Sequence, residues 1–214
     1  MNIIRARHSV RQYKDLPIEK NIRQILDDLV TQINKDNNLH IQILYDEPDC
    51  FNRLNIHYGK IKGCNNYISL VGPKSDKLDE TIGYYGELLV LKVQELGLNS
   101  CWVYLTHGES KAVVNQGEKE ACIISIGYGL DQGKDRRSKS VKEVSNYQDG
   151  FPDWFRLGIE ATLLAPTAIN QQKYYFEYND GEVSAKVKGL GFCTKIDLGI
   201  VKYHFERVPG IKVK

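Results

Sequence analysis

Residues 121–128 read ACIISIGY, a run in which nearly every side chain is apolar or small. An apolar run of this length predicts a buried strand near the centre of a sheet. Two other stretches have strand character, residues 40–45 (HIQILY) and 66–71 (NYISLV), and residues 99–105 (NSCWVYL) are expected to be extended. We therefore expect one central sheet built around residues 121–128.

Helices are predicted before and after these strands by apolar residues at helical spacing. One covers residues 18–33. Another covers residues 78–96 and contains Gly83 and Gly86, which would let a second backbone approach closely. The remaining predicted elements are a short helix over 109–115, a helix over 152–164, a hairpin formed by 173–178 and 182–187, and a helix over 195–207.

The mixture of hairpins and crossovers indicates an α+β fold, with a central mixed or antiparallel sheet flanked by helices. A chain of 214 residues is expected to form a single domain. The order helix, loop, strand, strand, helix occurs twice along the chain. This weak internal repeat predicts two pseudo-symmetric halves, over roughly residues 1–150 and 151–214.

The composition is that of a globular protein, with 42% hydrophobic and 26% charged residues. A net charge of +2 argues against nucleic acid as the main partner. No apolar run approaches the length of a membrane span, and arginines occupy the place of a signal sequence, so we expect no membrane association and a cytoplasmic location. Five cysteines without a C-x-x-C pair argue against a disulfide framework and a metal site.

Two basic segments are candidate anion sites. Arg7, His8, Ser9 and Arg11 combine forked donors with a hydroxyl, which suits a phosphate group; the alternative is a solvated basic N-terminus. Residues 134–142 carry five cations in a loop that follows the central strand; the alternative is a solvated charged loop. Two basic segments in one chain favour a bound anionic cofactor more than either segment does alone.

A third candidate is residues 165–172 (APTAINQQ), where a helix ends at a proline and small residues lead into side-chain amides. Backbone N–H groups and amides suit the polar edge of a heteroaromatic ring; the alternative is a helix cap and turn. Cys101 is interpreted as a small core residue. The common nucleotide-binding and hydrolase motifs are missing, since Gly127-Tyr128-Gly129 does not continue into a dinucleotide fingerprint.

Taken together, these segments resemble the FMN-dependent nitroreductase family. RHSVRQY (residues 7–13) is similar to its R-x-S-x-R-x-[FY] motif, and ELGLNSCWV (residues 95–103) to its G-L-G-x-x-C-W segment. APTAINQQ (residues 165–172) is similar to its A-P-S-x-x-N-x-Q-P motif, and RRSKSVKEV (residues 136–144) to its basic phosphate-binding segment. The four similarities are spread over most of the chain, and they imply a nitroreductase-like fold.

The resemblance implies FMN as cofactor, NAD(P)H as co-substrate and a nitroaromatic, quinone or similar small molecule as electron acceptor. The chemistry would occur at N5 of the flavin, so no catalytic side chain is expected. The phosphate and ribityl chain would be held by Arg7, His8, Ser9 and Arg11, with further phosphate charge from Arg136, Arg137 and Lys139. The edge of the ring would be lined by Pro166, Thr167 and Asn170, and its face or N5 would lie near Val103, Tyr104 and Leu105.

This sequence departs from the family pattern in the order of its motifs. The A-P-S-x-x-N motif usually follows soon after the arginine motif, whereas here it lies in the C-terminal half, and Gln172 precedes Lys173 rather than proline. The order resembles a branch in which one chain mimics the usual homodimer, as a monomer with a single-chain FMN site; a homodimer is the alternative. A non-catalytic flavin or nucleotide binder, such as a sensor, and an RNA- or anion-binding module are the competing functions.

Overall fold

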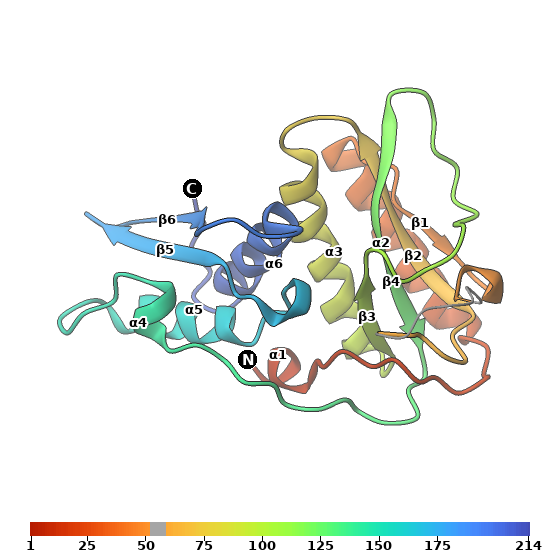
Figure 1. The fold of residues 1–214 in the computed structure, drawn as a ribbon, viewed down its shortest axis with the longest axis horizontal. Helices are drawn as coiled ribbons and strands as arrows, with labels where there is room; N and C mark the ends of the chain where they lie inside the picture. Colours follow the sequence, from red (N-terminus) through yellow and green to blue (C-terminus); the bar gives the residue numbers. More distant parts are fainter. Residues whose placement is uncertain (52–58) are drawn as a thin grey trace. The chain divides into compact units, whose positions relative to one another are not determined.

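The computed structural model describes residues 1–51 and 59–214, and the chain divides into two compact units. The first, here called the sheet unit, comprises Arg7–Leu78 and Leu89–Lys134. The second, the hairpin unit, comprises Met1–Ala6, Asp79–Leu88 and Asp135–Lys214. Both therefore draw on segments that are distant in the sequence, and the long helix α3 (Leu78–Glu95) contributes to each (Figure 1).

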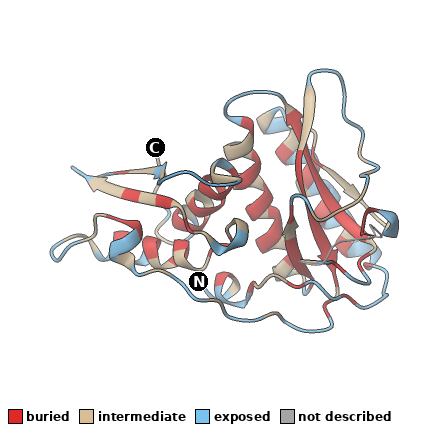
Figure 2. Ribbon diagram, viewed as in Figure 1, coloured by how far each residue is buried: buried red, intermediate tan, exposed pale blue. Residues whose placement is uncertain are grey.

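The sheet unit is built on a four-stranded antiparallel sheet in the order β1-β2-β4-β3. Its strands are β1 (Gln42–Leu44), β2 (Asn66–Pro73), β3 (Asn99–Val103) and β4 (Glu118–Gly127). The last seven residues of β4 are all buried, as are seven of the eight residues of β2 (Figure 2). The expected central strand and antiparallel sheet are thus confirmed.

Helix α2 (Lys20–Asn37) belongs to the same unit and buries an apolar face formed by Ile22, Leu26, Val30 and Ile33. Its C-terminal turn is tied to the residue that precedes β1. The Asn34 side chain accepts a hydrogen bond from the Ile41 N–H (2.8 Å) and donates one to the Ile41 carbonyl (2.8 Å). The predicted helix over 18–33 is therefore present, displaced toward the C-terminus.

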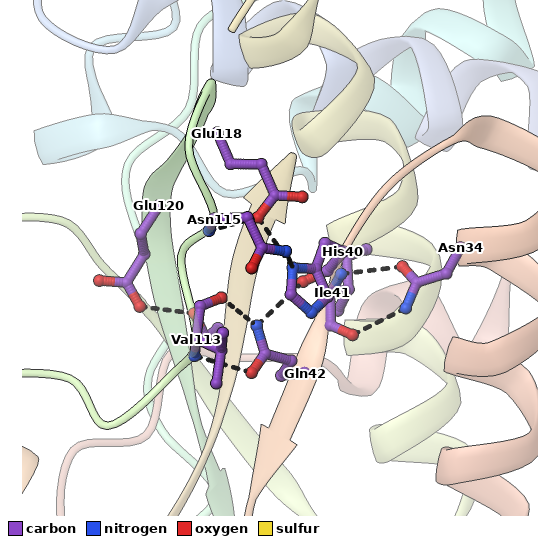
Figure 3. Close-up of polar contacts among 9 residues, drawn as sticks. Asn34, His40, Ile41, Gln42, Val113, Asn115, Glu118 and Glu120 are labelled. Atoms are coloured by element: carbon purple, nitrogen blue, oxygen red, sulfur yellow. Dashed lines mark hydrogen bonds and ion pairs between the residues drawn. The ribbon is translucent and has the colours of Figure 1, made fainter. Parts of the chain in front are cut away.

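The prediction of a short helix over 109–115 is wrong, because these residues form part of an irregular loop between β3 and β4 (Figure 3). Gln42 bonds the backbone of Val113 twice, accepting from its N–H (2.9 Å) and donating to its carbonyl (2.8 Å). The Asn115 N–H donates to Glu118 (2.8 Å), whose carboxylate also lies 2.9 Å from Nδ1 of His40. Side chains thus bind backbone groups that a helix would pair internally.

The hairpin unit combines helices α5 (Asp153–Leu163) and α6 (Thr194–Arg207) with the antiparallel hairpin of β5 (Tyr174–Asn179) and β6 (Glu182–Val187). All four elements correspond to predicted ones. The structure adds short helical segments that the sequence analysis did not predict: α1 (Asn2–Ala6), η1 (Pro48–Phe51), which belongs to the sheet unit, α4 (Val141–Val144) and η2 (Ala168–Asn170). No helix in the described parts of the chain has the length and apolar character needed to cross a membrane.

A close helix crossing organises the hairpin unit. A Cβ atom on Gly83 of α3 would collide with the carbonyl oxygen of Ile196, and one on Gly199 of α6 would collide with that of Glu80. The two helix backbones therefore approach each other at positions where only glycine fits. This confirms the expected close approach at Gly83. It also sets the position of the first turns of α6, which contact the candidate segment of residues 165–172.

Candidate functional site

The arginine motif runs along the outer edge of β3 in the sheet unit. Ser9 pairs with Ser100 in a parallel bridge, and the Val10 N–H donates to the Ser100 carbonyl (3.0 Å). Val10 and Tyr13 are buried in the core of this unit, which anchors the segment from inside. Backbone pairing and two apolar anchors thus fix the course of residues 7–13.

The thiol of Cys101, on the strand that the motif follows, is buried. The Ser9 side chain is hydrogen-bonded to this thiol. Burial raises the pKa of Cys101, and the positive charges of Arg11 and Arg7 oppose that rise. Arg7 is itself only 4% exposed. The motif brings guanidinium groups and a hydroxyl to this edge of the sheet, and such groups are the donors that a phosphate monoester takes.

A glycine-rich turn packs directly against this motif. A Cβ atom on Gly133, where φ is +77°, would lie 2.5 Å from Cβ of His8. A Cβ on Gly129 would lie 2.6 Å from the side-chain oxygen of Asn99 and 2.9 Å from Val10. The glycines after β4, which form no dinucleotide fingerprint, therefore have a structural reason, which is contact with residues 8–10.

The segment expected near the ring face straddles the end of β3. Val103 is the last residue of the strand and is buried in the core of the sheet unit. Tyr104 and Leu105 follow it and are exposed. Because the Val103 side chain packs in the core, only Tyr104 and Leu105 of these three residues have accessible side chains.

In the hairpin unit, the basic segment and the APTAINQQ segment lie side by side. The Arg137 carbonyl accepts hydrogen bonds from the side-chain amides of Asn170 (2.8 Å) and Gln172 (3.3 Å). The Lys139 N–H donates to the Gln172 side chain (2.9 Å), and Nζ of Lys139 donates to the Gln172 carbonyl (2.6 Å). The structure thus joins two segments that are more than twenty residues apart in the chain.

Two of the three cations in this group bind backbone carbonyls. The Arg136 guanidinium donates to the carbonyls of Leu163 (3.1 Å) and Ala165, at the C-terminal end of α5, where a positive charge is favourable. Lys139 is engaged with Gln172, as described above. Arg137 is exposed. The sequence analysis did not anticipate that Arg136 and Lys139 support the neighbouring loop.

The loop over residues 166–172 has an unusual backbone. Ile169, Asn170 and Gln172 have φ values of +46°, +56° and +46°, in the left-handed region that favours glycine. This conformation is least favourable for a β-branched residue such as isoleucine. A side-chain bond closes the loop, since Oγ1 of Thr167 accepts from the Gln172 N–H (3.1 Å).

Asp197, which the sequence analysis missed, also binds this loop. It lies in the first turn of α6, where its two oxygens accept from the Ala168 N–H (2.9 Å) and from the Gln171 side-chain amide (2.7 Å). Burial raises its pKa to about 6, and these two hydrogen bonds limit the rise. Nothing in the local sequence marks this residue, because its contacts reach back 26 and 29 positions.

The candidate residues therefore form two groups, one in each unit. The sheet unit assembles the arginine motif, the end of β3 and the glycine-rich turn. The hairpin unit assembles residues 136–139 and 166–172. The first group offers guanidinium and hydroxyl donors of the kind that bind phosphate, and the second offers side-chain amides of the kind that bind the polar edge of a heteroaromatic ring.

Comparison with known proteins assigns the family. The chain matches a family model described as "Putative TM nitroreductase" over residues 1–208. It belongs to this nitroreductase family, which confirms the resemblance drawn from the motifs. No curated protein matches the chain at a significant level.

Solved structures with this fold include a "putative nitroreductase" from Thermotoga maritima MSB8, with a TM-score of 0.70 and 20% identity over 99% of this chain and 85% of that one. An FMN-dependent nitroreductase from Clostridium difficile R20291 has a TM-score of 0.53 and 22% identity over 71% and 100% of the two chains. A "putative nitroreductase in complex with FMN" from Desulfovibrio desulfuricans has a TM-score of 0.54 and 16% identity over 71% and 96%. These similarities confirm the nitroreductase-like α+β fold.

Proposed function

We propose that this protein is an FMN-dependent oxidoreductase that takes hydride from NAD(P)H and reduces a small electron-poor acceptor such as a nitroaromatic or a quinone. The family and the FMN named for two structures of the same fold support this assignment. The observation in this chain that carries it is the placement of the arginine motif along β3, where Ser9 pairs with Ser100 and Arg7 is buried.

The residues of the sheet unit fit the phosphate end of FMN. Arg7 and Arg11 would supply charge-assisted hydrogen bonds and Ser9 a hydroxyl, while His8 would contact the phosphate or ribityl chain. Val10 and Tyr13 would hold these donors in place, because both are buried beneath the segment. Arg7 is buried as well, so it would lose little side-chain freedom on binding an anion.

The residues of the hairpin unit fit the ring of FMN. Pro166, Thr167 and Asn170 would line its edge. Arg137 would add charge for the phosphate, whereas Arg136 and Lys139 would act mainly through the loop, since their side chains bind its carbonyls. Tyr104 and Leu105 of the sheet unit would lie near the ring face and limit the access of water.

FMN held by these residues would supply the redox chemistry, which is hydride transfer from NAD(P)H and electron transfer to the acceptor. The protein then has to bind, orient and shield, which requires no acid or base of its own. The side chains assigned to the site meet this demand, because they are cations, amides, hydroxyls and apolar groups.

An anaerobic experiment tests the proposal. Protein loaded with FMN is mixed with NADH or with NADPH, the loss of the oxidised flavin absorbance is followed, and a nitroaromatic or quinone is then added. Reduction followed by reoxidation is the expected result. FMN that binds but is reduced by neither nucleotide would instead identify a non-catalytic flavin protein, and a protein that binds no FMN would exclude both functions.

A further inference from the structure

Asp197 is a buried carboxylate whose hydrogen bonds go to the loop of residues 166–172. It is 2% exposed, and each oxygen accepts from a different loop residue, the Ala168 N–H and the Gln171 amide. Within residues 1–51 and 59–214, no ion pair joins Asp197 to a cation. Burying a carboxylate without a cation is unfavourable, so a packing role alone would be better served by an apolar side chain.

The backbone conformation of the loop of residues 166–172 is not the one that its own residue types favour. Ile169 is left-handed although it is β-branched, and its side chain is 76% exposed, so little burial compensates for the strain. Asn170 and Gln172 are left-handed as well. Such strain persists only where the surroundings impose it, and it is concentrated at binding sites.

Asp197 supplies part of that constraint from outside the loop. Its Oδ1 holds the backbone immediately before Ile169, and its Oδ2 holds the side chain of Gln171, whose Nε2 also donates to the Phe192 carbonyl (2.6 Å). The helix that carries Asp197 packs closely against α3, because a Cβ atom on Gly199 would collide with the Glu80 carbonyl. Two of the three strained residues, Ile169 and Asn170, therefore lie between two contacts to one helix.

We propose that Asp197 is a positioning residue whose carboxylate holds residues 166–172 in the conformation that receives the flavin ring. This inference rests on the proposed function, since the ligand of the loop is taken to be FMN. It goes beyond the proposed function in one respect. Flavin affinity should depend on the charge of Asp197, although Asp197 does not contact the flavin.

The pH at which the effect should appear follows from the surroundings of Asp197. Burial raises its pKa to about 6. The nearby titratable groups are the Cys193 thiol, whose pKa burial raises to about 12, and the Tyr174 hydroxyl, whose pKa burial also raises. Asp79 acts on Cys193, and the Arg136 charge acts on Tyr174. Arg136 stays protonated and the Cys193 thiol and Tyr174 hydroxyl stay neutral around neutral pH. Asp197 is therefore the group whose charge changes in this range.

Protonation would weaken the hold on the loop. A carboxylate offers acceptors on both oxygens, whereas a carboxylic acid carries a hydroxyl on one of them and forms weaker bonds with N–H donors. Flavin affinity should therefore fall as the pH falls through about 6. Asp197→Asn fixes the neutral state, and Asp149→Asn is the matched control, because Asp149 is an exposed aspartate of the same unit.

The test measures FMN dissociation constants by quenching of flavin fluorescence for the wild type and both variants, between about pH 5 and pH 7.5. The phosphate of FMN titrates in this range, but its effect cancels in the ratio of variant to wild-type constants. For Asp197→Asn the ratio should be roughly 10 at the higher pH, as expected for one lost charge-assisted bond, and should approach 1 at the lower pH. For Asp149→Asn it should stay near 1. A ratio near 1 for Asp197→Asn at every pH would overturn the proposal.

A second measurement on flavin-free protein separates this inference from the proposed function. Asp197→Leu removes both acceptors and the buried charge, and amide exchange at Ala168 is followed by NMR. Exchange should become roughly 10-fold faster than in the wild type, the change expected for one lost hydrogen bond. Unchanged exchange at Ala168 would refute the positioning role, whether or not FMN binds. Absence of FMN binding by the wild type would instead refute the proposed function.

Discussion

The two candidate segments, residues 7–13 and residues 166–172, are held in place in different ways. The first is extended and pairs its backbone with β3, and Val10 and Tyr13 fix it to the core. The second is an irregular loop with three left-handed residues, held by the Asp197 side chain of α6 and by backbone groups of Arg137 and Lys139. The arginine motif is thus anchored to the sheet of its own unit, whereas the loop of residues 166–172 depends on long-range polar contacts within the hairpin unit.

The difference predicts that the two segments respond differently to mutation. A change in the arginine motif removes ligand donors and leaves the backbone in place, because backbone pairing does not depend on those side chains. A change around the loop alters the geometry itself, because individual side-chain bonds impose it.

The largest contrast concerns which chain supplies each segment. We expect one chain to contribute both, so that Arg7→Ala and Asn170→Ala, each defective in FMN binding alone, recover nothing when the two proteins are mixed and reassociated. If the segments came from different chains of a dimer, hybrids would regain some intact sites. Flavin retained after gel filtration of the mixture is the measurement, and clear recovery would refute the single-chain site.

The pH dependence of stability should distinguish the loop side from the sheet side. The folded-state pKa of Asp197, about 6, lies above the ordinary value of 3.8, so the folded protein holds this proton more tightly than the unfolded chain does. Its contribution is complete below about pH 4 and is lost as the pH rises through about 6, a change of up to about 3 kcal/mol. Urea unfolding of the wild type and Asp197→Asn at both ends of this range should show that difference, and parallel curves would contradict it.

Arg7→Ala should weaken FMN binding about 10- to 100-fold, through the loss of charge-assisted hydrogen bonds of roughly 1.5–3 kcal/mol. Riboflavin, which lacks the phosphate, should bind the wild type weakly and be nearly indifferent to the change. Arg5→Ala is the matched control, since Arg5 is exposed and lies two positions before the motif. Equilibrium titration with each flavin provides the test, and unchanged FMN affinity in a folded Arg7→Ala protein would remove Arg7 from the site.

The smallest expected effect is a gain in stability. Ile169→Gly should raise the free energy of unfolding by up to about 1 kcal/mol, because glycine adopts φ = +46° without strain and little buried surface is lost. Ile169→Ala keeps the strain and serves as the control. Thermal unfolding of the two variants should place Ile169→Gly above Ile169→Ala, and the reverse order would show that the loop is not strained.

The sequence predicted the elements that have a clear period. The apolar run at β4, the helical stripes of α2, α3 and α6, and the Asn-Asp-Gly turn of the β5–β6 hairpin each carry a local signal. Helices α1 and α4 have five and four residues, too few to show a helical period. The helix expected over 109–115 failed because Gln42 and Glu118 bind that backbone from elsewhere in the fold.

Only the parts of the candidate site that are formed by contiguous residues could be predicted from the sequence. RHSVRQY and APTAINQQ could be recognised as segments. The left-handed backbone at Ile169 could not, because isoleucine disfavours that conformation. Nor could the partnership of Asp197 with Ala168, or of Arg136 with the end of α5, since both depend on how helices and loop pack.

The most direct test of the account is the visible absorption spectrum of the purified protein, recorded as isolated and again after incubation with excess FMN and gel filtration. We expect a flavin band in the blue that is retained through gel filtration, at no more than one FMN for each chain. A protein that is colourless as isolated and releases all added FMN during gel filtration would contradict the assignment of Arg7, Ser9 and Arg11 to a flavin phosphate, and with it the proposed function.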